Sequence, residues 1–337
     1  MNRKEAFQIY KEFNEKIQAY SLVLHTTGFD RLTIAPKGGN AYRNRMSAIV
    51  EGELFSISTD PRYAEAVLTL SQTKLSQERQ RDVALAKKSL EDVLKFSKEE
   101  MMEYSLAQMN SYDAWCEAKN TENYELFRPH LLKLIDLSMR RFERRDPKKD
   151  PYEIALDDFE EGMNSEIYDR FFSLIKEELL PLIRKIDKKR DRINDSFLYR
   201  YYPAERQAEF MKDIMKYLGY SSDWGYMGIT EHPFTDGISR NDVRVTTAYD
   251  EYNITSAIYS LIHECGHAFY EHQVNPRYDH YPYLGNMSSG MHESQSRFFE
   301  NYLGRRKSFF VKLYPRLQEL FPENLGDVSL DNFIRAV

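Results

Sequence analysis

Residues that interrupt helices are scarce in this sequence. It contains 14 glycines and 12 prolines, together 26 of 337 residues. This scarcity leaves room for long uninterrupted helices and argues against a turn-rich β-sandwich. Apolar residues recur at helical spacing from Arg3 to Leu24, which predicts a helix with one buried stripe. The same spacing predicts further helices over residues 62–120, 124–144 and 164–192.

Breaks between these helices are predicted from local signals. Ser97 is expected to cap a helix that begins at Lys98, with Glu100 in its first turn. A loop is expected over residues 26–43, which carry Pro36, Gly38 and Gly39. We therefore expect a mainly α fold, an array of long helices in a single domain over residues 1–337. The helical array would cover 1–218 and a metal-site region 219–312.

The character of the chain changes after about Gly219. Turn-forming and aromatic residues become frequent, and the alternating segment VRVTTAY predicts a small β element near residues 242–249. Helical spacing returns at Ile254. The metal-site region is therefore expected to combine a short strand with helices.

Charge and cysteine content exclude several classes of protein. Lys+Arg 47 against Asp+Glu 53 gives a net charge of -6, which argues against nucleic acid as a partner. No apolar run approaches the roughly 20 residues that span a bilayer, and the N-terminus lacks the apolar core of a secretory signal. Cys116 and Cys265 cannot form a disulfide framework. We expect a cytoplasmic protein with no membrane partner.

Histidines cluster in one part of the chain. Six of the eight fall between positions 232 and 292, and at their centre is the HExxH pattern HECGH. In this pattern His263 and His267 share a helix face and can hold one metal, while Glu264 serves as general base.

Helix geometry directs the two histidines away from the apolar side of the same helix. At 100° per residue, the pair lies nearly opposite one apolar sector, in which Cys265 is expected to be a packed thiol. That sector comprises Ile254, Ala257, Ile258, Leu261, Ile262, Cys265, Ala268 and Phe269.

A hydrolytic zinc site needs a third protein ligand and one open position. Glu293 is the candidate, on a helix over residues 292–301 that returns antiparallel to the first after a loop. Arg297 and Glu300 are expected on the same side, with Glu300 orienting a ligand imidazole and Arg297 balancing its charge. The apolar face of this helix is expected to comprise Met291, Phe298, Phe299, Tyr302 and Leu303.

Four motifs resemble those of a known family. They are HPFT (232–235), DVRVTT (242–247), HECGHAFYE (263–271), and HESQSRFFEN (292–301) followed by GRR (304–306). In order and spacing they are similar to the motifs of the carboxypeptidase Taq family of zinc metallocarboxypeptidases. The resemblance implies a mostly helical fold with a deep cleft and gluzincin-type active-site helices. It also implies a metal held by His263, His267 and Glu293, Glu264 as catalytic base, and a homodimer.

The sequence departs from this family at its end. Family members run on for roughly another third, with IRxxAD and GxxQDxHW motifs, whereas this chain stops at DNFIRAV. We expect a fragment or natural truncation that lacks the family's C-terminal segment, or a partner that supplies it.

The predicted function is zinc-dependent removal of C-terminal residues from peptides, with one Zn²⁺ per chain or another divalent ion such as Co²⁺. Donors to the developing oxyanion would be His232, His292 or a tyrosine of residues 278–283. Arg244 would hold the substrate's terminal carboxylate, unless it pairs structurally with Asp242 or Asp250.

Two other functions remain open from the sequence. A helical oligoendopeptidase would share the HExxH motif and the downstream Glu, but it should also cleave peptides with an amidated C-terminus. A truncated, non-catalytic metal-binding or interaction module would bind the metal without turnover.

Overall fold

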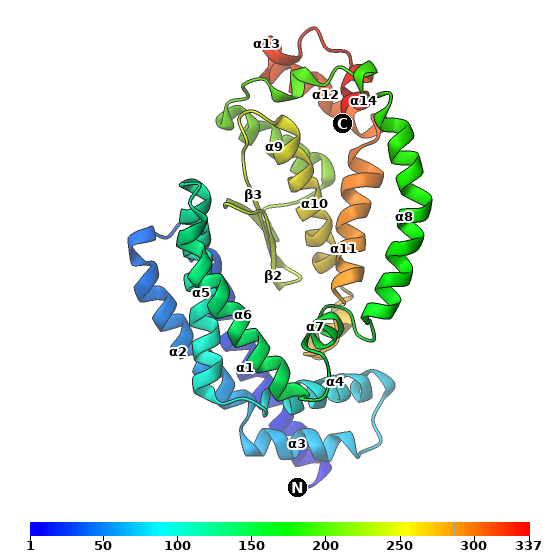
Figure 1. The fold of residues 1–337 in the computed structure, drawn as a ribbon. Coiled ribbons are helices and arrows are strands. Elements are labelled where there is room, and N and C mark those ends of the chain that lie inside the picture. Colours follow the sequence, from blue (N-terminus) through cyan, green and yellow to red (C-terminus); the bar gives the residue numbers. More distant parts are fainter. Residues whose placement is uncertain (286–287) are drawn as a thin grey trace. The chain divides into compact units, whose positions relative to one another are not determined.

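The computed structural model describes residues 1–285 and 288–337, and its contacts divide the chain into two compact units. The first unit comprises Met1–Asp158 with Asn275–Met287, and the second comprises Phe159–Val274 with Ser288–Val337. Positions 286 and 287, in the loop expected between the two metal helices, lie outside the described residues. The predicted mainly α fold is confirmed in both units (Figure 1). The single domain and the deep cleft stay predictions.

The first unit is built from helices. Among them α1 packs against α2 and α3, and α5 packs against α2 and α6. Two short 3₁₀ helices accompany them, at Lys37–Gly39 and Pro276–His280. The α-helices are α1 (Arg3–Thr33), α2 (Asn40–Ser58), α3 (Pro61–Ser71), α4 (Gln77–Val93), α5 (Lys98–Asn120), α6 (Tyr124–Arg145) and α7 (Pro151–Phe159), which ends at the unit boundary.

The predicted start of α5 is confirmed by its hydrogen bonds. The Glu100 backbone N–H donates to Ser97 Oγ at 3.2 Å, and the Ser97 N–H donates to the Glu100 carboxylate at 2.8 Å. These bonds satisfy two of the N–H groups that a helix start leaves without a partner. The helix therefore begins at Lys98, as the sequence indicated.

The loop predicted over residues 26–43 is wrong. Helix α1 continues to Thr33, and α2 begins at Asn40. Two threonines donate to carbonyls of their own helix, Thr27 to Val23 at 2.7 Å and Thr33 to Phe29 at 2.6 Å. The hydroxyl groups are thus satisfied within the helix, and burial of the Phe29 ring favours its continuation, so the chain turns only around Pro36.

A buried carboxylate ties a loop to the core of the first unit. Asp82 is fully buried and accepts hydrogen bonds from Tyr10 Oη at 2.9 Å, Arg79 Nη1 at 3.1 Å and the Tyr283 backbone N–H at 3.0 Å. Tyr63 Oη also lies 3.1 Å from Tyr283 Oη. The segment around Tyr283 is thereby fixed to α1, α3 and α4.

The second unit combines helices with one small sheet. The helix predicted over 164–192 ends at Asp187, and the helix predicted from Ile254 is confirmed. Its elements are α8 (Ser165–Asp187), 3₁₀ helices at Arg190–Arg192 and Ser196–Tyr199, α9 (Ala204–Leu218), β1 (Gly225–Ile229), β2 (Thr235–Ser239), β3 (Asp242–Thr247), α10 (Ile254–His272), α11 (Ser289–Arg297), a π-helix at Phe298–Gly304, α12 (Lys307–Leu320), α13 (Pro322–Leu325) and α14 (Leu330–Ala336).

The predicted β element is the central strand of a three-stranded sheet. The strand order is β1-β3-β2, with β1 parallel and β2 antiparallel to β3. Val243 and Val245 of β3 are fully buried in the same core cluster as the apolar side of α10. Strands β1 (GYMGI) and β2 (TDGIS) were not predicted, because they are short and contain glycine. The sheet supports α10, which packs on β2 and β3.

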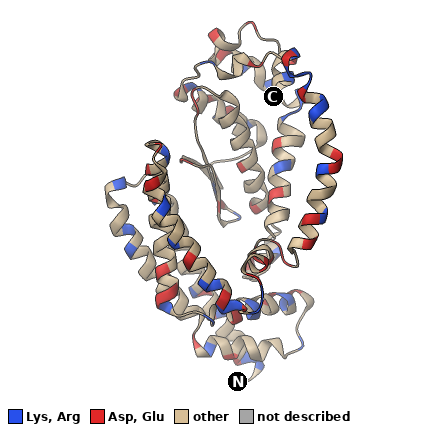
Figure 2. Cartoon of the chain, in the orientation of Figure 1, with Lys and Arg blue, Asp and Glu red and all other residues tan. Residues whose placement is uncertain are grey.

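Helix α8 has no buried residue. Along it acidic and basic side chains interrupt the apolar ones, and both signs are also interspersed along the other helices (Figure 2). Among the described residues, no helix is long and apolar enough to cross a membrane. The exposed apolar side chains of α8 are Phe171, Phe172, Leu174, Leu179, Leu180, Leu182, Ile183 and Ile186.

Candidate metal centre

The HExxH motif lies on α10. The Asn253 side chain caps this helix by accepting a hydrogen bond from the Thr255 N–H at 3.2 Å. All eight apolar residues predicted to face the core are buried, including Cys265. The side chains of His263 and His267 keep 17% exposure each. The helix is thus anchored by its apolar side, while both imidazoles stay accessible.

Helix α11 runs antiparallel to α10, as predicted. His263 contacts Glu300, and Glu271, two turns further along α10, contacts His292. Gly266 permits this close packing, because a Cβ at that position would lie 2.7 Å from Ser296 Cα and 3.0 Å from the Gln295 carbonyl oxygen. The glycine inside the HExxH motif therefore sets how closely the two helices approach.

His263, His267 and Glu293 converge on one point. Glu293 Oε2 lies 3.4 Å from His263 Nε2 and 3.4 Å from His267 Nε2, and one ligand atom from each residue lies within 4.8 Å of the others. Ligand atoms bound at 2.0–2.1 Å around a tetrahedral zinc ion are roughly 3.3–3.4 Å apart. The three residues therefore fit a zinc-sized cation with no rearrangement of the Glu293 contacts.

Glu300 and Arg297 support this group. Glu300 is buried, and its Oε2 lies 3.0 Å from His263 Nδ1. Arg297 donates to Glu293 Oε1 at 2.8 Å and to Glu300 Oε2 at 2.9 Å. Burial alone would raise the pKa of Glu293, but the bonds from Arg297 and Ser296 and the His263 charge lower it overall. Glu293 is thus held as an anion that can bind a metal.

His267 is supported by a chain of two further side chains. Its Nδ1 lies 2.5 Å from His292 Nδ1, and His292 Nε2 lies 2.6 Å from Glu271 Oε1. With Nε2 of His267 facing Glu293, its Nδ1–H donates to His292, whose Nε2–H donates to Glu271. Burial, together with the neighbouring imidazoles His292 and His263, lowers the pKa of His267 to about 4, which keeps it neutral and able to bind a metal.

Glu264, the second residue of the motif, lies against strand β2. It is 7% exposed, and Thr235 Oγ1 donates to its Oε2 at 2.6 Å. Burial raises the pKa of Glu264, and this effect outweighs the hydrogen bond from Thr235 and the charge of His263, which lower it. A buried carboxyl group with a raised pKa is suited to exchanging protons near neutral pH.

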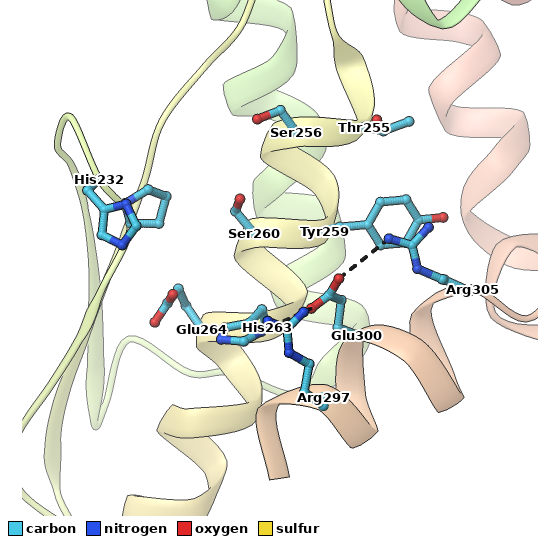
Figure 3. Close-up of a pocket in the computed structure, with 11 residues that line it drawn as sticks. His232, Thr255, Ser256, Tyr259, Ser260, His263, Glu264, Arg297, Glu300 and Arg305 are labelled. Carbon is cyan, nitrogen blue, oxygen red and sulfur yellow. Dashed lines mark hydrogen bonds and ion pairs between the residues drawn. The ribbon is translucent and has the colours of Figure 1, made fainter. Parts of the chain in front are cut away.

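A pocket opens beside Glu264 and His263. It has a volume of about 490 Å³, and Figure 3 shows His232 on a separate segment facing α10. Its lining also includes Arg297 at the end of α11, Glu300 in the π-helix and Arg305 directly after the π-helix. The pocket thus places a predicted substrate-binding residue, His232, in the same cavity as the predicted general base.

Arg244 has a different environment. Its Nε and Nη2 each donate to the Asp242 carboxylate at 2.8 Å, and it is not among the residues that line this pocket. Of the two alternatives, the geometry matches the structural ion pair with Asp242. His292, the other predicted oxyanion donor, has both ring nitrogens engaged by His267 and Glu271.

The predicted apolar face of the second helix is wrong in part. Met291, Phe298 and Tyr302 are exposed by 51%, 46% and 64%, whereas Phe299 packs against the core. From Phe298 the chain forms a π-helix, whose wider turn changes the face on which each later side chain lies. Periodicity at 100° per residue does not apply to such a segment.

Three residues of the site were not assigned roles from the sequence, namely Thr235, Gly266 and Glu271. All three stand inside the motif strings HPFT and HECGHAFYE. Glu271 also lies four residues after His267 and therefore on the same helix face, a spacing that could have predicted its place near the metal ligands. Thr235 carried no such signal, because its contact with Glu264 depends on the strand β2.

Comparison with known proteins identifies the family. The sequence model of the carboxypeptidase Taq (M32) metallopeptidase family matches residues 9–337. The chain belongs to this family. The predicted resemblance is thereby confirmed, and membership of a metallopeptidase family implies a bound metal.

Individual M32 proteins agree with this assignment. Carboxypeptidase 1 of Bacillus subtilis (strain 168) is 35% identical over 99% of this chain and 66% of the relative. The crystal structure of BsuCP superposes with a TM-score of 0.94 at 34% identity, covering 99% of this chain and 67% of that one. The M32 carboxypeptidase from Deinococcus radiodurans R1 gives a TM-score of 0.85 at 31% identity, covering 98% and 67%. The present chain thus spans about two thirds of the length of these M32 proteins.

Proposed function

We propose that this chain is a zinc-dependent metallocarboxypeptidase that removes C-terminal residues from peptides. The observation that carries the proposal is the convergence of His263, His267 and Glu293 beside Glu264, with Glu293 at tetrahedral ligand spacing from both imidazoles. The family supports a peptidase that uses a metal. Zinc is proposed because two imidazoles and one carboxylate are a ligand set of catalytic zinc sites. We propose one metal ion per chain, with Co²⁺ as the alternative ion.

In this proposal, His263, His267 and Glu293 hold the metal. A zinc ion bound there supplies Lewis-acid polarisation of the scissile carbonyl and lowers the pKa of water to about 7. Glu300 accepts from His263 Nδ1–H, and His292 accepts from His267 Nδ1–H, so both imidazoles present Nε2 to the metal.

Glu264 would move the proton. Its carboxylate takes a proton from the attacking water, whose oxygen forms a bond to the scissile carbon. When the C–N bond breaks, Glu264 returns the proton to the leaving amine. Thr235 holds the carboxylate in one orientation through its 2.6 Å hydrogen bond. His232 lies in the same pocket and is proposed as a donor to the developing oxyanion.

Substitution of Glu264 by Gln tests this assignment. Glu264→Gln keeps the size of the side chain but cannot accept a proton, so we expect hydrolysis to be lost while about one metal per chain is retained. Metal analysis and release of free amino acid from an unblocked peptide provide the two measurements. Metal loss in this variant would contradict the role given to Glu264.

The same assay distinguishes the other two functions. Release of amino acid that is lost when the peptide C-terminus is amidated supports a carboxypeptidase. Cleavage of both peptides would identify an oligoendopeptidase, and metal binding without turnover would identify a non-catalytic module.

Assembly and location belong to the proposal as well. We propose a homodimer in the cytoplasm with no nucleic-acid partner, in keeping with the negative net charge and with two cysteines that form no disulfide. Light scattering of the purified chain at several concentrations measures the oligomeric state.

A further inference from the structure

The first half of α11 has little packing to hold it, although it carries the proposed ligand Glu293. All nine residues of this helix are described, and only Ser296, near its end, is buried. The Glu293 side chain keeps 45% exposure. A helix of this length is only marginally stable in water by itself. Bonds at the start of α11 should therefore matter for the position of Glu293.

Two side chains accept hydrogen bonds at the start of α11. Ser288 is the N-cap, and its Oγ accepts from the Met291 N–H at 3.4 Å. Glu160 Oε2 accepts from the Gly290 N–H at 2.9 Å. Glu160 and Gly290 both belong to the second unit. The shorter of the two bonds thus comes from a carboxylate 130 residues away in the sequence.

A carboxylate suits this place. The N–H groups at a helix start lack partners within the helix and carry a partial positive charge, which an anion stabilises. Glu160 follows directly after α7, in a turn where its carbonyl oxygen accepts from the Met163 N–H at 3.0 Å and Gly162 adopts a φ of 85°. The backbone of Glu160 is therefore held by a bond that does not involve α11.

Gly290 allows the carboxylate to come this close. A Cβ on residue 290 would lie 2.5 Å from Glu160 Oε2 and 3.3 Å from the carboxyl carbon of Glu160. Because these atoms are the end of a flexible side chain, a methyl group there would push the carboxylate away and break its bond to the helix. A change at either residue therefore removes the same hydrogen bond.

This bond lies close to the proposed ligand along the helix. Gly290 precedes Glu293 by three residues, less than one helix turn. We propose that Glu160 is a positioning residue of the metal centre. By holding the Gly290 N–H it fixes the first turn of α11, and it thereby keeps Glu293 Oε2 within reach of both imidazoles. This inference rests on the proposed function, in which Glu293 is a metal ligand.

Metal affinity in single and double variants tests the pair. Chelator competition with Zn²⁺ measures the dissociation constant of the wild type, Glu160→Ala, Gly290→Ala and the double variant. We expect each single variant to raise the constant about threefold to tenfold, the effect of one hydrogen bond. The double variant should bind no more weakly than either single variant, because both changes remove the same bond. Additive losses, or no loss in Glu160→Ala, would overturn the proposal.

Two further variants distinguish positioning from a general effect. Glu160→Gln keeps an acceptor oxygen, so its affinity should stay within about threefold of the wild type. Glu161→Gln removes the neighbouring exposed acid and should leave affinity unchanged. An equal loss in Glu161→Gln would indicate a general charge effect and overturn the proposal.

Bound Co²⁺ reports on the ligands directly. Its visible absorption depends on ligand geometry, so the spectrum should change in Glu160→Ala and return in Glu160→Gln. A variant that is only less stable would bind Co²⁺ with the spectrum of the wild type. An unchanged spectrum in Glu160→Ala would therefore contradict a positioning role.

Amide hydrogen exchange separates this inference from the proposed function, because it needs no metal. In the metal-free protein, amides of residues 289–293 should exchange faster in Glu160→Ala than in the wild type, while those of α10 stay the same. This difference in a chain that binds no metal would keep the anchoring of α11 and reject the proposed function. Hydrolysis by the wild type, with unchanged exchange and zinc affinity in Glu160→Ala, would keep the function and reject the role of Glu160.

Discussion

The two imidazoles of the candidate metal centre are oriented by different partners. His263 donates from Nδ1 directly to the buried carboxylate of Glu300, whereas His267 reaches Glu271 only through the neutral ring of His292. A carboxylate partner makes an imidazole a stronger ligand than a neutral one does. We therefore regard His263 and Glu300 as the more firmly held side of the centre.

Removing the carboxylate ligand Glu293 should weaken metal binding more than changing the supporting residue Glu300. Glu293→Ala deletes the oxygen that lies 3.4 Å from both Nε2 atoms, so we expect the metal dissociation constant to rise more than 100-fold. Glu300→Gln, which changes only a supporting contact, should raise it about 10- to 100-fold. Competition with a chelator measures both constants, and unchanged affinity in Glu293→Ala would remove Glu293 from the centre.

The pH dependence of hydrolysis should respond to Thr235. Its hydrogen bond lowers the pKa of Glu264 against the larger effect of burial. Thr235→Val keeps the shape but removes the hydroxyl, so the pKa of Glu264 should rise. As the pH falls, Glu264 should then become protonated, and inactive as a base, at a higher pH than in the wild type. We expect the acidic limb of the kcat/KM profile to move upward in pH, with little change in metal content. An acidic limb that stays fixed or moves downward would show that Thr235 does not act on Glu264.

The residues that meet at the metal centre were predictable because their spacing repeats a helix turn. His263 and His267 are four residues apart on one helix, and Glu293 is the first acid of the next predicted helix. Residues such as Thr235 and Arg305 depend on strand β2 and on the π-helix. Neither element leaves a periodic pattern in the sequence.

At the scale of elements, the centre depends on how closely α10 and α11 pack. The side chain missing at Gly266 leaves room for the backbone of Ser296, which is itself fully buried. Ser296 Oγ in turn donates to Glu293 Oε2 at 3.0 Å. The packing of α10 against α11 is thus linked to the proposed ligand Glu293 through one hydrogen bond.

Gly266→Ala should therefore lower both stability and metal affinity. A methyl group there meets backbone atoms that cannot rotate away, so we expect the free energy of unfolding to fall by about 1–3 kcal/mol. Gly28→Ala is the matched control, because it also lies within a helix and a Cβ there meets nothing within 4 Å. That variant should be more stable by up to about 1 kcal/mol. Denaturant unfolding of both variants measures these changes. A Gly266→Ala variant that is as stable as Gly28→Ala would contradict the packing argument.

Elements with strong local signals were predicted correctly, and those set by tertiary contacts were not. Ser97 and Glu100 mark the start of α5 by themselves. The end of α1 was misplaced, because the apolar spacing was followed only to Leu24, whereas the burial of Phe29 continues the helix to Thr33. Burial of this kind depends on neighbours far along the chain, which a local pattern does not include.

At the scale of the whole molecule, most buried apolar side chains of the described residues gather in two core clusters. One gathers residues of α1, α3 and α4, and the other gathers α9, α10, β3 and α12 with residues near the end of the chain. Tyr202 belongs to the second core, where its ring packs at 4.9 Å on Phe321 and its Oη donates to the Phe197 carbonyl at 2.7 Å. It is a buried tyrosine whose ionisation can be followed.

Stability at alkaline pH should depend on Tyr202. Burial raises its pKa from 10.0 to about 12, so its contribution is complete below pH 10 and is lost as the pH rises toward 12. In that interval the wild type should lose about 1.4 kcal/mol per pH unit from this group. Tyr202→Phe should be less stable by about 1 kcal/mol at pH 8, and this deficit should shrink and then reverse above pH 10. Urea unfolding at several pH values tests this, and a constant difference would refute it.

The π-helix after Arg297 makes this stretch of the chain intolerant of changes in length. Its wider turn holds Glu300 toward His263 and Arg305 toward Tyr259. Deleting one residue between Arg297 and Glu300 would turn every later side chain by about 100° around the axis. Both contacts would then be lost together, without any change of residue at the metal centre. Insertions and deletions should therefore be rarer here among working enzymes of the family than in its surface loops.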